Sequence, residues 1–246
     1  MSRKPDFLIT GPSQVGTYLL VTALSQHSEI GFPTTMEAPF FSEDENFKKG
    51  TGWYYPRFNS TKGKGCVGEA LPDCFSRAIP RARIYRHLPE VKVVCILEDP
   101  IERLLTSLTE RENKDRPPAQ LAQELFGENI QTNDLEAVLS CGQYYFHLRE
   151  WQDIFRPEQV FVLFLEDFVS APATELAGLL RWLGCSESPV SELNIDLDEI
   201  CCNISLDLRG SLETTERSRL QDYYRPYNKM LFDHLQRDPS LWENDQ

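Results

Sequence analysis

The sequence predicts a single α/β domain with a central, mostly parallel β-sheet flanked by helices. Three observations indicate this fold class. Short apolar, β-branched runs alternate with longer amphipathic segments, as in repeated β–α units. The run Val91–Leu97 is apolar almost throughout, which is typical of a strand covered on both faces. The length of 246 residues suits one domain, spanning residues 1–246, with a substantial core.

The first predicted β–α unit carries the main candidate site. Phe7–Thr10 is a short apolar strand, Gly11 and Gly16 mark a turn, and Thr17–Leu24 begins a helix. The first N–H groups of a helix lack intrahelical partners, and the helix dipole favours an anion there. One interpretation is therefore a phosphate bound at residues Val15, Gly16, Thr17 and Tyr18. The other is an ordinary βα turn, because this glycine spacing alone is a weak signal.

Two other nucleotide-binding signatures are missing from this turn. A Walker motif has Lys and Ser/Thr directly after its second glycine, whereas Thr17 and Tyr18 follow Gly16 here. The Gly-x-Gly-x-x-Gly pattern of dinucleotide-binding folds is also missing. The sequence therefore disfavours a nucleotide triphosphatase, a nucleotide kinase and a dinucleotide-dependent enzyme.

The second β–α unit consists of the strand Val91–Leu97 and a helix over Ile101–Arg111. Ligands bind at the carboxyl ends of parallel strands, so its turn should lie beside the first. Arg103 and Thr106 could supply a cation and a hydroxyl to a second phosphate. Alternatively, Arg103 is a surface residue paired with Glu102 or Glu110.

The rest of the chain continues the alternation. A third buried strand is expected over residues 160–165, and residues 193–210 are irregular. Further helices are expected at residues 76–86, 118–125, 135–155, 173–183 and 212–235.

One carboxylate is a candidate general base. Glu37 precedes the aromatic pair Phe40-Phe41, and partial desolvation beside aromatic rings would raise its pKa. Without further context, the commoner interpretation is a solvated loop glutamate.

Charge and cysteine content limit the partners. The net charge of −13 disfavours nucleic acid, and no run of 18 apolar residues suggests a membrane span. The seven cysteines are scattered without metal-ligand spacing, so we expect reduced thiols and no metal. The expected location is the cytoplasm, or the chain is the soluble domain of a protein whose membrane stem is not in this sequence.

Together these stretches resemble the sulfotransferase superfamily, most closely its carbohydrate branch of heparan sulfate N- and O-sulfotransferases. The likeness spans nearly the whole chain, through an ordered set of motifs. These are Leu8-Ile-Thr-Gly…Gly-Thr17, Leu24-Ser-Gln-His-Ser-Glu-Ile30, Glu37-Ala-Pro-Phe-Phe41, Gly50-Thr-Gly-Trp-Tyr54, Gly68-Glu-Ala-Leu-Pro-Asp73, Ile96-Leu-Glu-Asp-Pro-Ile-Glu-Arg103, Trp151…Phe155, Leu165-Glu-Asp-Phe168 and Tyr224-Arg-Pro-Tyr-Asn-Lys229.

The resemblance implies transfer of a sulfuryl group from PAPS (phosphoadenosine phosphosulfate) to a hydroxyl or amine, leaving PAP. It implies that Glu37 is the catalytic base and that the turn from Val15 to Tyr18 holds the 5′-phosphate. Thr106 takes the place of the 3′-phosphate serine of the family. Arg103 and Arg209 are further candidates for contacts to the nucleotide.

Several cations of the family pattern are replaced here. The phosphate-loop lysine falls on Gln14, which donates a hydrogen bond without carrying a charge. The arginine that many relatives place before Asp-Pro is Glu98, and the lysine on the substrate side falls on Ala70. The Lys-Gly-Arg loop aligns with residues 205–209, where Arg209 is the one matching cation.

Two functions therefore remain open. The chain is an active sulfotransferase with an altered PAPS site, or an inactive member that serves as a binding or scaffolding module. The negative charge disfavours polyanionic heparan sulfate as the acceptor, so a neutral, small or carbohydrate acceptor is expected.

Overall fold

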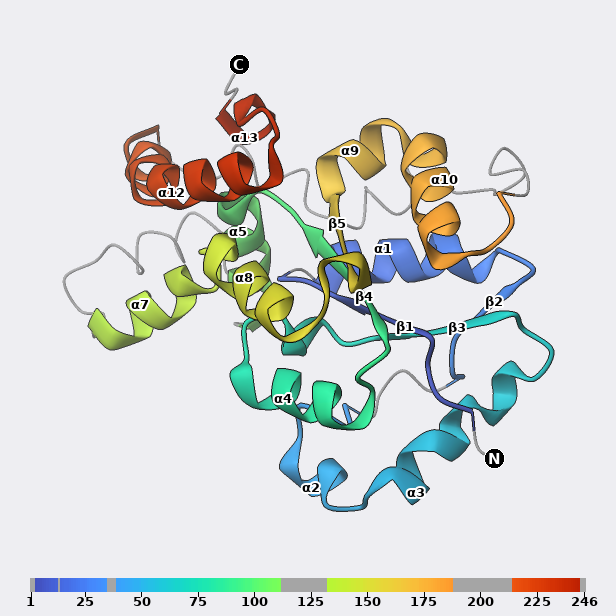
Figure 1. Cartoon of the computed structure of the whole chain (residues 1–246). Coiled ribbons are helices and arrows are strands. Elements are labelled where there is room, and N and C mark those ends of the chain that lie inside the picture. The colour runs from blue at the N-terminus through green and yellow to red at the C-terminus, as the bar shows by residue number, and fades with distance from the viewer. Residues whose placement is uncertain (1–2, 13, 35–38, 112–131, 188–213, 244–246) are drawn as a thin grey trace. The chain divides into compact units, whose positions relative to one another are not determined.

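The computed structural model describes residues 3–12, 14–34, 39–111, 132–187 and 214–243 (Figure 1). The strands are β1 (Phe7–Thr10), β2 (Ile30–Gly31), β3 (Cys66–Ala70), β4 (Lys92–Leu97) and β5 (Val160–Phe164). The helices are α1 (Gln14–Ser25), α2 (Asp44–Phe47), α3 (Thr51–Tyr54), α4 (Ala78–His87), α5 (Pro100–Arg111), α7 (Thr132–Ser140), α8 (Tyr144–Ile154), α9 (Leu165–Ser170), α10 (Pro172–Leu183), α12 (Thr214–Leu235) and α13 (Ser240–Glu243). Three 3₁₀ turns lie at Tyr55–Thr61, Pro72–Cys74 and Pro157–Gln159.

The five strands form one parallel sheet in the order β2-β3-β1-β4-β5, which confirms the predicted fold class. Every residue of β1 is buried, and β4 is buried after its first residue. Figure 1 shows α1 and α10 on one face of this sheet and α4 on the other. Burial of both faces explains why the strands read as continuous apolar runs.

The chain forms two compact units. The first, residues 1–97 and 148–196, holds the sheet. The second, residues 98–147 and 197–246, has its own apolar core, made by side chains of α5, α7 and α12: Ile101, Leu104, Leu105, Leu139, Leu220 and Tyr224.

Three predicted boundaries were wrong, and the strands β2 and β3 were not predicted. The helix expected over residues 135–155 is interrupted between α7 and α8, at a turn that contains Gly142. A Cβ on Gly142 would lie 2.6 Å from the ring of Tyr224, so α12 approaches the backbone closely at this turn. The first helix begins at Gln14, three residues before its predicted start. The strand predicted over residues 160–165 ends at Phe164, because α9 begins at Leu165.

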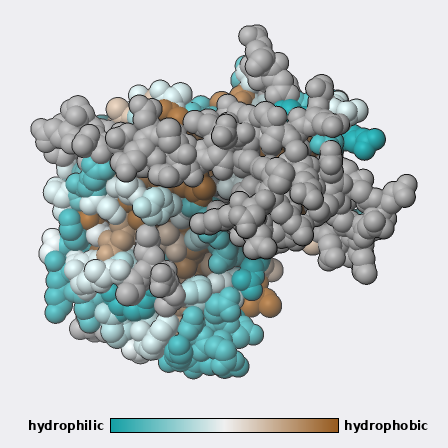
Figure 2. All heavy atoms as spheres, turned by 180° about the vertical axis from the view of Figure 1, so that it is seen from behind, coloured by the Kyte–Doolittle hydropathy of each residue, from teal (hydrophilic) through white to brown (hydrophobic). Residues whose placement is uncertain are grey.

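Several buried or half-buried arginines form ion pairs within each unit. Arg81 contacts Glu150, Arg57 contacts Glu69 at 3.1 Å, and Arg217 contacts Glu102 at 2.7 Å. The lower part of the face in Figure 2, the level at which Figure 1 places α2 and α3, is hydrophilic. None of the described helices is long and apolar enough to cross a membrane.

Where the chain leaves β1, it lies so close to the end of the neighbouring strand β4 that there is no space for a side chain. A Cβ on Gly11 would lie 2.2 Å from the carbonyl oxygen of Ile96, and one on Gly16 would lie 3.3 Å from its Cδ1. Neither glycine has a positive φ. Both are required by close packing of the turn and α1 against β4, rather than by an unusual backbone conformation.

We expect Gly11→Ala to lower the free energy of unfolding by about 3 kcal/mol, because the new methyl group would overlap a backbone oxygen that cannot turn away. Urea titration followed by circular dichroism measures this change. Gly178→Ala is the matched control: it lies inside α10 with nothing within 4 Å of its added Cβ. That substitution should raise stability by roughly 0.5–1 kcal/mol. Equal effects of the two substitutions would contradict the packing argument.

Candidate functional site

The centre of the sheet contains a topological switch point. After β1 the chain passes through α1 to β2, on one side of the sheet, whereas β4 is followed in the sheet by β5 on the other side. The carboxyl ends of the adjacent strands β1 and β4 therefore flank the place where strand order reverses. Ligands bind at such points in open parallel sheets.

The turn after β1 is held at this switch point by hydrogen bonds to the chain that follows β3. Thr10 Oγ1 donates to the carbonyl oxygen of Leu71 at 2.9 Å, and the Leu71 N–H donates to the Ile9 carbonyl oxygen at 2.8 Å. Together with the close approach of Gly11 to Ile96, these contacts fix the direction in which the chain enters α1.

The predicted phosphate-loop residues lie together in the first turn of α1. Gln14 and Tyr18 have exposed side chains, Val15 is half-buried, and Gly16 and Thr17 are buried. No acidic residue lies in this turn of α1, where the helix N-terminus carries a partial positive charge. The structure thus brings Gln14, Val15, Gly16, Thr17 and Tyr18 into one helical turn at the switch point.

A buried polar cluster lies near the end of β3. Glu69 is 4% exposed, accepts a hydrogen bond from the Tyr54 hydroxyl, and pairs with Arg57 Nη1 at 3.1 Å. Burial raises the pKa of Glu69 to about 7, although Tyr54 and Arg57 both act to lower it. Sequence reasoning gave Glu69, Tyr54 and Arg57 no role. Tyr54 and Glu69 lie in the motifs Gly50–Tyr54 and Gly68–Asp73, but the sequence does not reveal that these two segments contact each other.

The ring of Tyr54 joins this cluster to the aromatic pair that follows Glu37. Phe40 stacks on Tyr54 with ring centroids 4.5 Å apart and an interplanar angle of 15°, and Phe41 meets the same ring edge-on at 5.1 Å. Both phenylalanines are fully buried. The chain is therefore anchored three residues after Glu37, while Glu37 itself lies outside the described residues, as does Arg209.

In the second unit, Arg103 is buried rather than exposed. It is 6% exposed and its guanidinium donates to the Val138 carbonyl oxygen at 3.2 Å. Glu102 pairs with Arg217 instead, so the alternative of a surface Arg103 paired with Glu102 was wrong. Arg103 Nε is buried and has no hydrogen-bond partner among the described side chains and backbone.

Thr106 and Glu98 belong to the same unit. Thr106 Oγ1 donates to the Glu102 carbonyl oxygen at 3.0 Å, one turn back in α5. Glu98 is 5% exposed. The pKa of the buried Tyr144 is raised, chiefly by desolvation; Arg103 lowers it and Glu98 raises it. Arg103 and Glu98 thus influence the pKa of the Tyr144 hydroxyl in opposite directions.

These features define an α/β protein in which a helix begins at the switch point of a parallel sheet. The family model described as "Sulfotransferase domain" matches residues 4–230, and the chain belongs to this family.

Comparisons with individual proteins agree with this assignment. The chain is 26% identical over 201 residues to "Bifunctional heparan sulfate N-deacetylase/N-sulfotransferase 1" of Caenorhabditis briggsae, covering 75% of this chain and 23% of that protein. It is 25% identical over 184 residues to the human "Heparan sulfate glucosamine 3-O-sulfotransferase 5", covering 73% of this chain and 53% of that protein. The chain therefore spans only part of these curated relatives, from about a quarter to about half of their length.

Solved structures show the same fold. A crystal structure of a sulfotransferase from Alicyclobacillus acidocaldarius aligns with a TM-score of 0.74 at 23% identity, covering 98% of this chain and 100% of that one. The mouse sulfotransferase SULT7A1, complexed with PAP, aligns with a TM-score of 0.52 at 11% identity, covering 94% of this chain and 85% of that one.

The buried Glu69 makes stability depend on pH. Because its pKa is raised from 4.5 to about 7 in the folded protein, the folded state holds a proton that the unfolded chain releases within this window. Stability should therefore fall as the pH rises from about 4.5 to about 7. The contribution of Glu69 to that fall is on the order of 3 kcal/mol.

Urea unfolding of the parent and of Glu69→Gln at pH 5 and pH 8 measures this effect. The difference in unfolding free energy should shift in favour of the Gln variant as the pH rises, since Gln does not titrate. Glu45→Gln, at an exposed ion pair with Lys48, is the control and should show no such shift. A pH-independent difference between the parent and Glu69→Gln would show that Glu69 is ionised throughout.

Proposed function

We propose that this chain transfers the sulfuryl group of PAPS to a hydroxyl or amine of a small or carbohydrate acceptor. The observation that carries the proposal is the match to the sulfotransferase domain over residues 4–230. The helix N-terminus at the switch point supports it, because this is where the fold would receive a phosphate.

The first turn of α1 fits the 5′ end of the nucleotide. In this proposal the N–H groups of Val15–Tyr18 bind the 5′-phosphate, and the exposed Gln14 amide faces the bridging oxygen. As the S–O bond to PAP breaks, negative charge develops on that oxygen, and Gln14 donates a hydrogen bond without a full charge. Loss of a charged partner at such a position costs on the order of 3 kcal/mol, or about a hundredfold in rate.

The residues proposed for the 3′-phosphate fit in part. Arg103 carries a buried nitrogen, Nε, without a partner among the described residues, as expected of a donor whose acceptor is a ligand. Thr106 currently donates its hydroxyl proton to Glu102, so binding a phosphate would require that proton to turn. Arg209 is proposed as a further cation, on the resemblance alone.

Glu37 is proposed as the base that removes the proton of the acceptor hydroxyl or amine as the new S–O or S–N bond forms. Anchoring of Phe40 and Phe41 on Tyr54 supports this role, because a base must be held within hydrogen-bond reach of the proton it takes. We propose a neutral or small acceptor, since a chain with a net charge of −13 disfavours a polyanion.

An inactive scaffold is the less favoured alternative. Gln14 and Glu98 favour this alternative, because they stand where the family pattern has a lysine and an arginine. Against it, the relatives that match about three quarters of this chain are named as transferases.

Titration of the purified chain with PAP, followed by calorimetry, tests the nucleotide site first. We expect micromolar binding that is weakened at least tenfold by Thr17→Ala combined with Thr106→Ala, because both hydroxyls are proposed phosphate ligands. Thr22→Ala, further along α1, is the matched control and should bind PAP like the parent. An acceptor screen with PAPS, measuring release of PAP, would follow. No binding at millimolar PAP would refute the enzymatic proposal.

Gln14→Lys tests the loop directly. We expect at least a tenfold gain in PAPS affinity or turnover, because the added ammonium would neutralise charge on the leaving oxygen. Gln26→Lys, at the opposite end of α1, makes the same change in net charge and should leave both quantities unaltered. Equal gains in the two variants would indicate a general charge effect; no gain in either would mean that this loop is not the sulfuryl site.

A further inference from the structure

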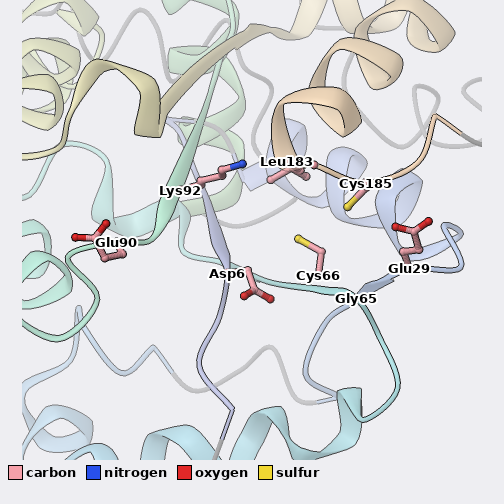
Figure 3. A pocket seen from close by; sticks show the side chains of 9 residues that line it. Asp6, Glu29, Gly65, Cys66, Glu90, Lys92, Leu183 and Cys185 are labelled. Carbon is pink, nitrogen blue, oxygen red and sulfur yellow. The ribbon is translucent and has the colours of Figure 1, made fainter.

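A cavity of about 360 Å³ lies at the amino ends of the strands, in the first unit. Its lining includes Asp6, which precedes β1, Cys66, which begins β3, and Lys92, which begins β4. Cys185, two residues after the end of α10, also lines this cavity (Figure 3). Because the strands are parallel, this edge of the sheet is opposite to the carboxyl ends that carry the proposed sulfuryl site.

Hydrogen bonds fasten the two cysteine-bearing segments to one residue. The Cys66 N–H donates to the Glu29 carbonyl oxygen at 2.9 Å. The neighbour of Cys185, Ser186, donates its N–H to the Glu29 carboxylate at 3.4 Å and its hydroxyl to the other carboxylate oxygen. Gly184 has a left-handed φ of 85°, which turns the chain at the end of α10 toward this position. Glu29 thereby holds the start of β3 and the end of α10 side by side.

Cys66 and Cys185 consequently line the same cavity. Figure 3 shows both sulfur atoms at this cavity, and each thiol influences the pKa of the other. Cys66 is 8% exposed and Cys185 is 9% exposed, whereas Cys74 and Cys95 are fully buried. A disulfide needs two cysteines whose side chains lie close together, and two thiols at one cavity, on segments that Glu29 ties together, are candidates for such a bond.

We propose that Cys66 and Cys185 form an intramolecular disulfide that links the start of β3 to the end of α10. Oxidised glutathione, or another small disulfide, is the oxidant. The bond is a covalent modification of this chain that its proposed transferase activity does not involve.

The reaction balances as two thiol–disulfide exchanges. The Cys185 thiolate attacks oxidised glutathione, forming a mixed disulfide and releasing one glutathione thiolate. The Cys66 thiolate then attacks the Cys185 sulfur, closing the internal bond and releasing the second glutathione. The two protein thiols are oxidised, and the two glutathione thiolates take up the two protons that the protein loses.

The surroundings make this a stabilising bond rather than a fast switch. Burial raises the pKa of Cys66 to about 12 and also raises that of Cys185; Asp6 and Glu29 act in the same direction and Lys92 opposes them. Few thiolates are present at neutral pH, so formation is slow and accelerates as the pH rises. The same groups are poor leaving thiols, so the formed disulfide is also reduced slowly.

Peptide mapping of the whole chain tests the proposal. The folded protein is incubated with oxidised glutathione at pH 8.5, remaining thiols are alkylated, and a proteolytic digest is analysed by mass spectrometry without reduction. We expect a linked pair of peptides containing Cys66 and Cys185. The bond closes a loop of roughly 120 residues, so the melting temperature should rise by about 5 to 10 °C over the dithiothreitol-treated protein.

Three variants sharpen the result. Cys66→Ala and Cys185→Ala should each lose the linked peptides and the rise in melting temperature. Cys141→Ala, which removes a partly exposed thiol elsewhere, should keep both. Complete alkylation of Cys66 and Cys185 after oxidation, a stable glutathione adduct on either residue, or a link from either to another cysteine would overturn the proposal. The map of the parent protein decides the question even if a variant does not fold.

Discussion

The approach of Gly11 to the carbonyl oxygen of Ile96 is the constraint on which the proposed site depends. At this point the chain leaves β1 beside the end of β4, with no room for a methyl group between them. Hydrogen bonds from Thr10 to Leu71 and from Leu71 to Ile9 tie the same turn to the chain that follows β3. The direction of α1 is thereby fixed from both sides. A helix N-terminus binds an anion well only if its N–H groups are held still, and here the sheet itself holds them.

A second constraint comes from the aromatic and ionic cluster around Tyr54. Its hydroxyl binds the buried carboxylate of Glu69, and its ring packs against Phe40 and Phe41. An unpaired buried carboxylate would be costly, and Arg57 and Tyr54 reduce that cost by satisfying both of its oxygens. The cluster thus connects the end of β3 to the segment after Glu37 through side chains that cannot be moved independently.

The sequence predicted the α/β architecture through β1, β4 and β5, because burial on both faces leaves an apolar run in each of these strands. It did not reveal β2, which has two residues, or β3, whose run is interrupted by Gly68 and Glu69. It failed where the structure depends on distant contacts. The break between α7 and α8 has a local signal in Gly142, but the close approach of the Tyr224 ring to it comes from more than eighty residues away along the chain. The burial of Arg103 depends on Val138 in α7, which no local pattern around α5 reveals. Glu69 was missed for the same reason: its partners Tyr54 and Arg57 lie outside its own strand. The roles of Glu37 and Arg209 remain predictions.

The ion pairs within the two units affect the electrostatic field that an approaching anion meets. Arg57, Arg81 and Arg217 are each bound to a carboxylate, so their charges are compensated locally, while the whole chain carries a net charge of −13. At long range such a protein repels a nucleotide that bears phosphate and sulfate groups. Dissolved salt shortens that repulsion to about 8 Å at physiological ionic strength. If PAPS is the co-substrate, as proposed, its encounter with this chain is faster in moderate salt than in dilute buffer, the reverse of the behaviour of enzymes that attract anionic substrates with a basic cleft.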